Sequence, residues 1–282
     1  MTRIAIASCC KIGGQKSVKY QTVWAKIQAQ QPELLLLLGD NVYMRQTGPR
    51  WQLDHLKQMY DEQLAEPHFA ALIGAVPYMA TWDDHDFGPN DSRGDTERDR
   101  PYRLRSRKLF HAAWQGAING NRPKVYCSHA IGQVKVILLD GRYYRTDCRS
   151  PSRRTILGKE QEDWLRDELQ HDLKYTLVGC GTPLGGSPQY KDSWAAYPEA
   201  HARLRALLGG AKKLVYVSGD IHRNKLTEHP EGFFEVTSSG VARIEQGQAA
   251  SSDNFAILDF KAASASVRLH GVASNGQSQR II

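Results

Sequence analysis

The chain has 282 residues, of which 41% are hydrophobic and 24% are charged, and this composition predicts a globular protein with a substantial core. No apolar run reaches the length of a transmembrane helix, and an odd number of cysteines, five, without a CxxC pair argues against a disulfide framework. The net charge of +7 predicts attraction for anionic partners such as phosphate esters, nucleic acid or anionic lipid.

The first half of the chain alternates predicted strands and helices. Strands are expected at 3–8, 34–38 and 77–82, and helices at 17–30, at 51–74 with a break at Pro67, and at 100–116. Leu34 to Leu38 form a short apolar run between Pro32 and Gly39, which is typical of a strand covered on both faces. The outer side of the helix at 100–116 is expected to carry arginines exposed to solvent.

The second half predicts further strands and two helices. A hairpin is expected at 124–130 and 133–140, helices at 158–171 and 198–208, and strands at 174–179, 213–218, 232–237, 254–260 and 264–270. The loops at 141–157 and 181–193 are irregular. This alternation predicts an α/β fold with a mixed sheet, and without a visible repeat or linker we expect one domain over residues 1–282.

Polar residues follow four of the predicted strands, at the point where ligands bind in open α/β sheets. The four strand ends read SCC at 8–10, GDNVY at 39–43, WDDHDFGPND at 82–91 and GDIH at 219–222. Crowded carboxylates repel one another, and bound cations would turn that repulsion into attraction. Carboxylate oxygens suit hard cations such as Ca²⁺ and Fe³⁺, while a thiolate or phenolate suits a transition ion.

The ordered motifs SC, LLGDNVY, TWDDHD with a following ND, LLDGRYYR and VSGDIH carry a family resemblance. Together they resemble the PhoD-like alkaline phosphatase and phosphodiesterase family, within the calcineurin-like metallophosphoesterases, over residues 5–222. The resemblance implies a four-layer α/β/β/α sandwich with mixed sheets and a centre of two or more metal ions. It further implies Fe³⁺ with Ca²⁺ as cofactors, with Mn²⁺ or Zn²⁺ as alternatives, and a phosphate ester as substrate.

Position by position, the resemblance also implies roles for the strand-end residues. Asp40 would bridge two metals, and Cys9 and Tyr43 would bind iron. Asp84 would be a metal ligand in the place of the asparagine of the superfamily's GNHE motif, and Asn90 would bind the second metal. Asp220 and His222 would close the site. Asp91 is an open alternative to Asn90, and His85 would lie near the leaving group. Ser8-Cys9 replaces the DxH common in the superfamily, and GDIH replaces GHxH, so metal identity stays open.

These residues predict a coherent reaction. Two adjacent metals can clamp a phosphoryl group and lower the pKa of a water. His85 would then protonate the departing alkoxide or hydrogen-bond a phosphate oxygen. Arg142 and Arg145 would hold the remaining oxygens. Asp83 and Asp86 are expected to orient their neighbours or cap a turn. The predicted function is therefore hydrolysis of phosphoric monoesters, diesters or both, including anionic polymers or lipids.

Two other functions stay open at this point. The basic charge is also typical of a protein that binds nucleic acid or an anionic surface without hydrolysis. Cys148 and Arg154 have the C-x5-R spacing of cysteine-dependent phosphatases, but Pro151 removes a backbone donor from that loop.

The apolar stretch in MTRIAIASCC is too short for a signal peptide, so a cytoplasmic location is expected. The sequence carries no signal for the oligomeric state.

Overall fold

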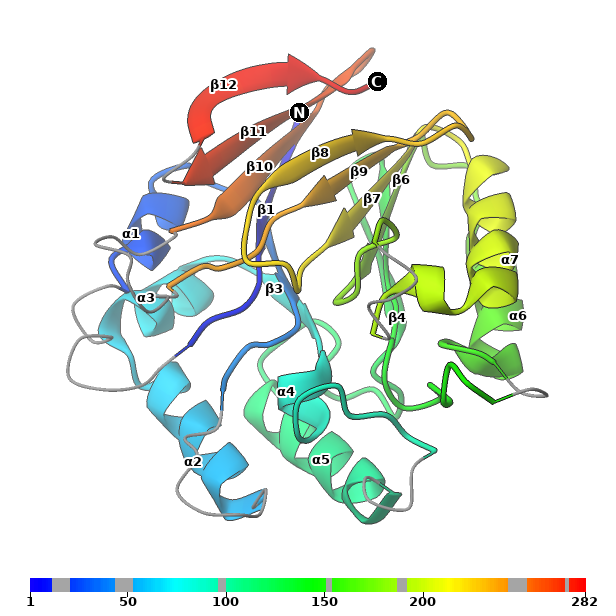
Figure 1. The fold of residues 1–282 in the computed structure, drawn as a ribbon. Coiled ribbons are helices and arrows are strands. Elements are labelled where there is room, and N and C mark those ends of the chain that lie inside the picture. The colour runs from blue at the N-terminus through cyan, green and yellow to red at the C-terminus, as the bar shows by residue number, and fades with distance from the viewer. Residues whose placement is uncertain are drawn as a thin grey trace.

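The computed structural model describes residues 1–11, 21–43, 53–95, 100–150, 154–186, 192–242, 253–271 and 274–282, and these form two six-stranded sheets (Figure 1). The first sheet has the order β12-β11-β10-β1-β2-β3, with β1 (Thr2–Ala7), β2 (Leu34–Leu38), β3 (Tyr78–Thr81), β10 (Phe255–Phe260), β11 (Ala265–Gly271) and β12 (Ser274–Arg280). The second has the order β4-β5-β6-β7-β9-β8, with β4 (Cys127–Ile131), β5 (Val134–Leu138), β6 (Tyr175–Cys180), β7 (Leu214–Ser218), β8 (Lys225–Glu228) and β9 (Phe234–Thr237).

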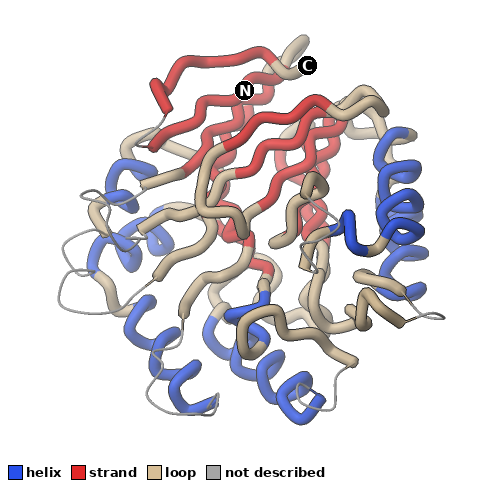
Figure 2. The backbone as a smooth tube through the Cα atoms, in the orientation of Figure 1, coloured by secondary structure: helices blue, strands red, loops and turns tan. Residues whose placement is uncertain are grey.

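Helices lie on the outer flanks of the two sheets, which gives four layers (Figure 2). On the side of the first sheet lie α1 (Val23–Gln28), α2 (Leu53–Leu64), α3 (Pro67–Ala75), α4 (Asp84–Phe87) and α5 (Arg100–Ala113). On the side of the second lie α6 (Gly158–Glu168), the 3₁₀ helix η2 (Trp194–Ala196) and α7 (Pro198–Gly209). The predicted four-layer α/β/β/α sandwich with mixed sheets is therefore confirmed.

The leucine run of β2 shows how the sequence builds these layers. Alternate side chains of a strand point to opposite faces. Leu34, Leu36 and Leu38 lie in the core between the two sheets. Leu35 and Leu37 lie in the core beneath the helices, together with Trp24, Phe69 and Trp114. All five leucines are buried, because β2 is covered on both faces.

Parallel pairing brings the polar strand ends to one edge. β1, β2 and β3 are parallel neighbours in the first sheet, and β5, β6, β7 and β9 are parallel neighbours in the second. Backbone hydrogen bonds join the two sheets there: Gly240 N, after β9, and Val241 N each donate to Ser8 O, after β1, at 3.0 Å. The ends of both sheets therefore face a common space.

Most predicted elements are confirmed, and the differences have physical reasons. The expected break at Pro67 separates α2 from α3, and Glu66 caps α3 by accepting a hydrogen bond from Phe69 N at 2.7 Å. Residues 17–20 and 51–52 of two predicted helices lie outside the described residues. The sequence analysis did not predict α4, β8 or β12. β8 and β12 are polar strands at sheet edges, so they lack the apolar signal of a buried strand.

Candidate metal centre

Three of the four predicted strand ends line one cleft of about 410 Å³, and the fourth lies behind it. It is lined by Asp40 and Tyr43 after β2, by Asp84, His85, Asn90 and Asp91 after β3, and by Asp220, Ile221, His222 and Arg223 after β7. Cys9, after β1, does not line the cleft but lies directly behind Asp40. The predicted metal ligands are thus gathered from four separate segments of the chain, although Asn90 and Asp91 are exposed at the rim.

Unusual backbone conformations hold this arrangement. Cys9, Asp40, Asp220 and His222 have φ values of 60°, 49°, 69° and 51°, and Asp91 at the rim has 56°. Such left-handed conformations cost free energy in residues other than glycine, and they cluster at functional sites. Their concentration at one strand edge indicates that the fold maintains these turns for the side chains they present.

Asp40 is the centre of the hydrogen-bond network. Its Oδ2 accepts a hydrogen bond from Tyr43 Oη at 2.6 Å and lies 3.6 Å from Cys9 Sγ, and its Oδ1 accepts from His85 N at 3.2 Å. Burial raises the pKa of Asp40 well above its ordinary value, and the charge of Asp84 raises it further. A carboxylate in this position is stabilised by a nearby cation.

Two donor groups share Asp40. In one, the ligand atoms of Cys9, Asp40 and His222 lie within 4.8 Å of one another, and in the other those of Asp40, Asp84 and His85 do. The Tyr43 hydroxyl lies beside the first group, 3.1 Å from His222 Nε2. A carboxylate that belongs to two adjacent groups is suited to bridge two cations. The site therefore supports more than one metal ion.

Asp220 provides an independent indication of a cation. Its Oδ2 is buried and has no hydrogen-bond partner among the described residues. A buried carboxylate oxygen without a partner is costly, and a metal ion is one of the partners that satisfies it. Burial also raises the pKa of Asp220, as do the nearby charges of Asp83, Asp192 and Asp84. The residues present therefore fit a multi-metal centre, both because their donor atoms suit metal ions and because the Asp220 Oδ2 atom lacks a hydrogen-bond partner among the described residues.

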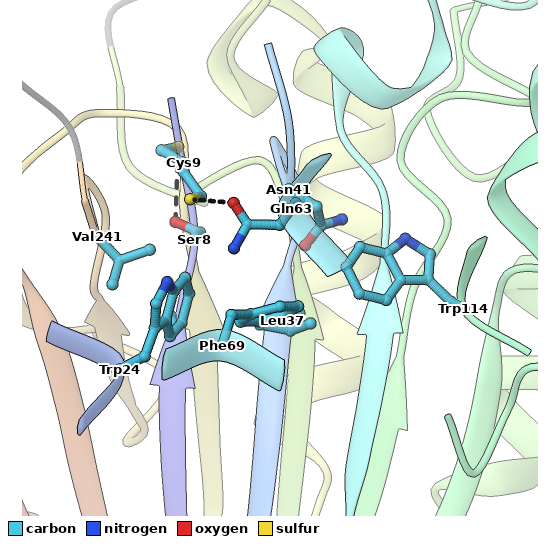
Figure 3. A pocket seen from close by; sticks show the side chains of 11 residues that line it. Ser8, Cys9, Trp24, Leu37, Asn41, Gln63, Phe69, Trp114 and Val241 are labelled. Carbon is cyan, nitrogen blue, oxygen red and sulfur yellow. Dashed lines mark hydrogen bonds between the residues drawn. The ribbon is translucent and has the colours of Figure 1, made fainter. Parts of the chain in front are cut away.

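Cys9 is closed off from solvent on the side away from the cleft. Its side chain is fully buried, and Ser239 Oγ donates a hydrogen bond to its Sγ at 3.1 Å. Beside it lies a space of only about 10 Å³, which is lined in part by Trp24 and Phe69, whose ring centroids lie 4.8 Å apart (Figure 3). Burial raises the pKa of Cys9 well above its ordinary value. A metal ion is the means by which such a thiol becomes a thiolate.

Arg142 and Arg145 are placed differently from the prediction. Both side chains are buried, and neither lines the cleft. Arg142 donates to Asp83 Oδ1 at 2.5 Å and to both carboxylate oxygens of Asp192, at 2.8 and 2.6 Å. Arg145 donates to Asp192 and to Thr182 Oγ1. Their expected contact with substrate oxygens is therefore wrong for this arrangement, because their donors are engaged in binding the loops together.

The remaining acidic residues after β3 hold the turn. Asp86 accepts hydrogen bonds from Asp83 N at 3.0 Å, Tyr60 Oη at 2.9 Å and Asn41 Nδ2 at 3.2 Å. Burial raises the pKa of Asp86 to about 7 despite these donors. Burial likewise raises the pKa of Asp83 to about 6, although Arg142 opposes the change. Burial also acts to raise the pKa of Asp84, but the charges of Arg142 and His85 outweigh it and lower that pKa to about 2.

Sequence reasoning missed three residues near the centre. Ser239 follows β9, so the rule that polar residues end parallel strands would have found it. Arg223 directly follows the GDIH motif, and its position next to His222 was an available signal. Asp192 lies in the irregular loop at 181–193, where no pattern separates it from its neighbours.

The alternative cysteine phosphatase loop lies elsewhere. Cys148 packs against the apolar core beneath α6 and α7, and it does not line the cleft. Residues 151–153 of this loop lie outside the described residues. Two arginines of the predicted solvated helix face also pack on an aromatic ring, since the guanidinium carbons of Arg103 and Arg107 lie 3.9 and 4.7 Å from the ring centroid of Tyr143.

The fold is shared with solved phosphatase structures. A structure of PhoD matches with a TM-score of 0.72 at 17% identity, covering 97% of this chain and 72% of that chain. A dimetal phosphatase from Danio rerio matches with a TM-score of 0.66 at 13% identity, covering 99% and 98%. At these identities the likeness shows the fold alone, and it places the chain in the class of two-sheet α/β proteins to which these phosphatases belong.

The family follows from the sequence comparison. A family model described as PhoD-like phosphatase matches residues 4–275, so the chain belongs to the PhoD-like phosphatase family. Alkaline phosphatase D of Bacillus subtilis (strain 168) is 26% identical over 294 residues, which cover 86% of this chain and 49% of that protein. The chain thus spans about half the length of this curated relative.

Proposed function

We propose that this protein is a metal-dependent hydrolase of phosphoric esters, acting on monoesters, diesters or both. The observation that carries the proposal is Asp40, a buried carboxylate shared by two donor groups at the wall of an open cleft. Membership of the PhoD-like phosphatase family supports the same chemistry. The substrate is a phosphate ester, and the net charge of +7 favours anionic molecules in general.

The donor set supports an assignment of ligands. Cys9, Tyr43 and His222 would hold one cation together with Asp40, and a thiolate, a phenolate and an imidazole suit a transition ion such as Fe³⁺. Asp84 and Asn90 would hold a second cation on the other side of Asp40, where oxygen ligands suit Ca²⁺. Mn²⁺ and Zn²⁺ are the alternatives. Asp220 would supply its unpartnered oxygen to the centre.

The chain's own residues then have distinct tasks. Bound cations supply Lewis acidity, which lowers the pKa of water and offsets the charge of a phosphoryl group. Water gives up a proton as its oxygen adds to phosphorus, the ester P–O bond breaks, and the departing oxygen takes a proton. His85 would give that proton, a role supported by its position at the cleft and by the hydrogen bond from its backbone N–H to Asp40. Its ring centroid lies 4.2 Å from that of Tyr43, which limits the directions the imidazole can face.

The proposal is tested by hydrolysis of nitrophenyl phosphate and bis(nitrophenyl) phosphate before and after treatment with EDTA. We expect hydrolysis of at least one ester, loss of that activity with EDTA, and recovery when metal is returned. A folded, metal-loaded protein that cleaves neither ester would contradict the proposal. A gel shift of nucleic acid that weakens with salt, without hydrolysis, would instead favour the binding protein considered above.

A further inference from the structure

Arg223 lines the cleft, and the proposed reaction gives it no role. Among the ten lining residues, it carries the one Lys or Arg side chain. The other charged groups around it are the carboxylates of Asp40, Asp84, Asp91 and Asp220. An arginine that only balanced these carboxylates would pair with one of them. Arg223 instead has no hydrogen bond or ion pair with any described residue, and its side chain is exposed.

The backbone on both sides of Arg223 is fixed. His222 N donates to Ser239 Oγ at 2.9 Å, and the φ of 51° at His222 sets the direction of the chain. On the other side, Asn224 Nδ2 donates to His270 O at 2.6 Å, and Asn224 Oδ1 accepts from Ser238 Oγ at 2.9 Å. The backbone at Arg223 is therefore held at a constant point on the rim, while its guanidinium group has no partner among the described residues.

A free guanidinium group beside a metal centre is suited to an anion. Arginine binds phosphate with two parallel hydrogen bonds, a geometry that lysine lacks. The two arginines buried below the site cannot serve, because Asp83 and Asp192 occupy them. We propose, resting on the proposed function, that Arg223 binds the nonbridging oxygens of the phosphoryl group and favours dianionic monoesters over monoanionic diesters.

Phosphate binding tests the contact without relying on turnover. Binding of inorganic phosphate to the metal-loaded protein is measured by calorimetry for wild type, Arg223→Ala, Arg223→Lys and Arg105→Ala. Arg105 is a matched control, because it is exposed on α5 and does not line the cleft. We expect the Kd to rise about tenfold or more in Arg223→Ala, and less in Arg223→Lys, since each lost charged hydrogen bond costs about this much. Arg105→Ala should match wild type.

Elemental analysis of the same samples shows whether a change in the Kd for phosphate comes from the lost arginine contact or from loss of bound metal. Weaker phosphate binding at unchanged metal content supports the inference. An unchanged Kd in Arg223→Ala overturns it, and so does a loss of bound metal in that variant, because the effect would then be structural. If the wild type cleaves neither ester but binds phosphate through Arg223, the proposed function and the assigned ester preference are overturned, and the phosphate contact of Arg223 is supported.

The preference between esters provides a second readout. A phosphate monoester carries nearly two negative charges at neutral pH, whereas a diester carries one. Loss of a cationic contact should therefore lower kcat/KM for nitrophenyl phosphate more than for bis(nitrophenyl) phosphate. Equal losses for the two esters in Arg223→Ala would overturn the assigned preference.

Discussion

At the scale of single residues, the structure distinguishes charged side chains that line the cleft from buried charged side chains that hold the surrounding loops together. Arg142 follows the strand end at Leu139–Asp140, so sequence reasoning assigned it to the substrate. Its backbone N–H donates to Asp140 Oδ1 at 2.9 Å, and its side chain turns inward to Asp83 and Asp192. Sequence position predicts which residues reach the edge of a sheet, but it does not predict which side of a loop a long side chain takes.

The buried Arg142 network makes a prediction about stability. Arg142→Ala should lower the free energy of unfolding by about 3–5 kcal/mol, because Asp83 would keep a buried charge without its arginine partner and Asp192 would retain only Arg145. Arg149→Ala is the control: Arg149 is 69% exposed in its pair with Asp147, and its loss should leave stability nearly unchanged. Urea denaturation measures both. Equal, small effects would show that the buried network contributes little.

At the scale of elements, the site depends on how closely the strand-end turns approach each other. Gly39, between β2 and Asp40, has a φ of 86°, and a Cβ placed there would lie 2.6 Å from Asp83 Cβ. At Gly219, between β7 and Asp220, a Cβ would lie 2.5 Å from Ser8 Oγ. These two glycines let turns from different strands touch, which brings their carboxylates to a common centre.

A pair of glycine substitutions tests this close approach. Gly39→Ala should displace the Asp83 turn and reduce both bound metal and ester hydrolysis by more than about tenfold, because a ligand misplaced by about 1 Å is costly. Gly74→Ala on α3 is the matched control, since an added Cβ would have no atom within 4 Å. This substitution should stabilise the protein by roughly 0.5–1 kcal/mol. Elemental analysis and thermal unfolding compare the two. Retained metal in Gly39→Ala would show that the turns adapt.

The same scale shows where prediction from sequence succeeds and where it stops. Buried strands and the break at Pro67 were predictable, because apolar patterning and proline geometry are local properties. The polar strand ends were predictable for the same reason, since each motif adjoins its own strand. Asp192 was not, because its partners Arg142 and Arg145 are 50 and 47 positions away in the sequence. Pairing between irregular loops has no periodic signal.

At the scale of the whole molecule, buried histidines make the stability of the fold depend on pH. No helix among the described residues is long and apolar enough to cross a membrane. Single-domain organisation and a cytoplasmic location stay predictions. Burial lowers the pKa of several histidines, including His270, whose ring stacks on Phe255 with centroids 4.4 Å apart. Protonation of these imidazoles at low pH should therefore lower the stability of the folded protein.

His270 makes a prediction about that link. Its pKa in the folded protein is lowered below the ordinary value of about 6.5, first by burial and then by Arg268, so the unfolded chain binds a proton more readily. Its contribution to stability is therefore present above pH 6.5 and is lost as the pH falls. His270→Phe, which keeps the stacked ring, should lose less stability than wild type between pH 7.5 and 5.5. Parallel urea titrations at the two pH values measure this, and identical losses would refute it.

The central claim is that strand ends from four segments share cations through Asp40. The most direct measurement is the number of metal ions per chain, determined by elemental analysis of purified wild type and of Asp40→Asn with folding checked by circular dichroism. The account predicts two or more ions per chain in wild type and a weakening of metal binding by more than about 100-fold in the folded variant. A wild type that takes up no metal, or a variant that keeps its full metal content, would contradict it.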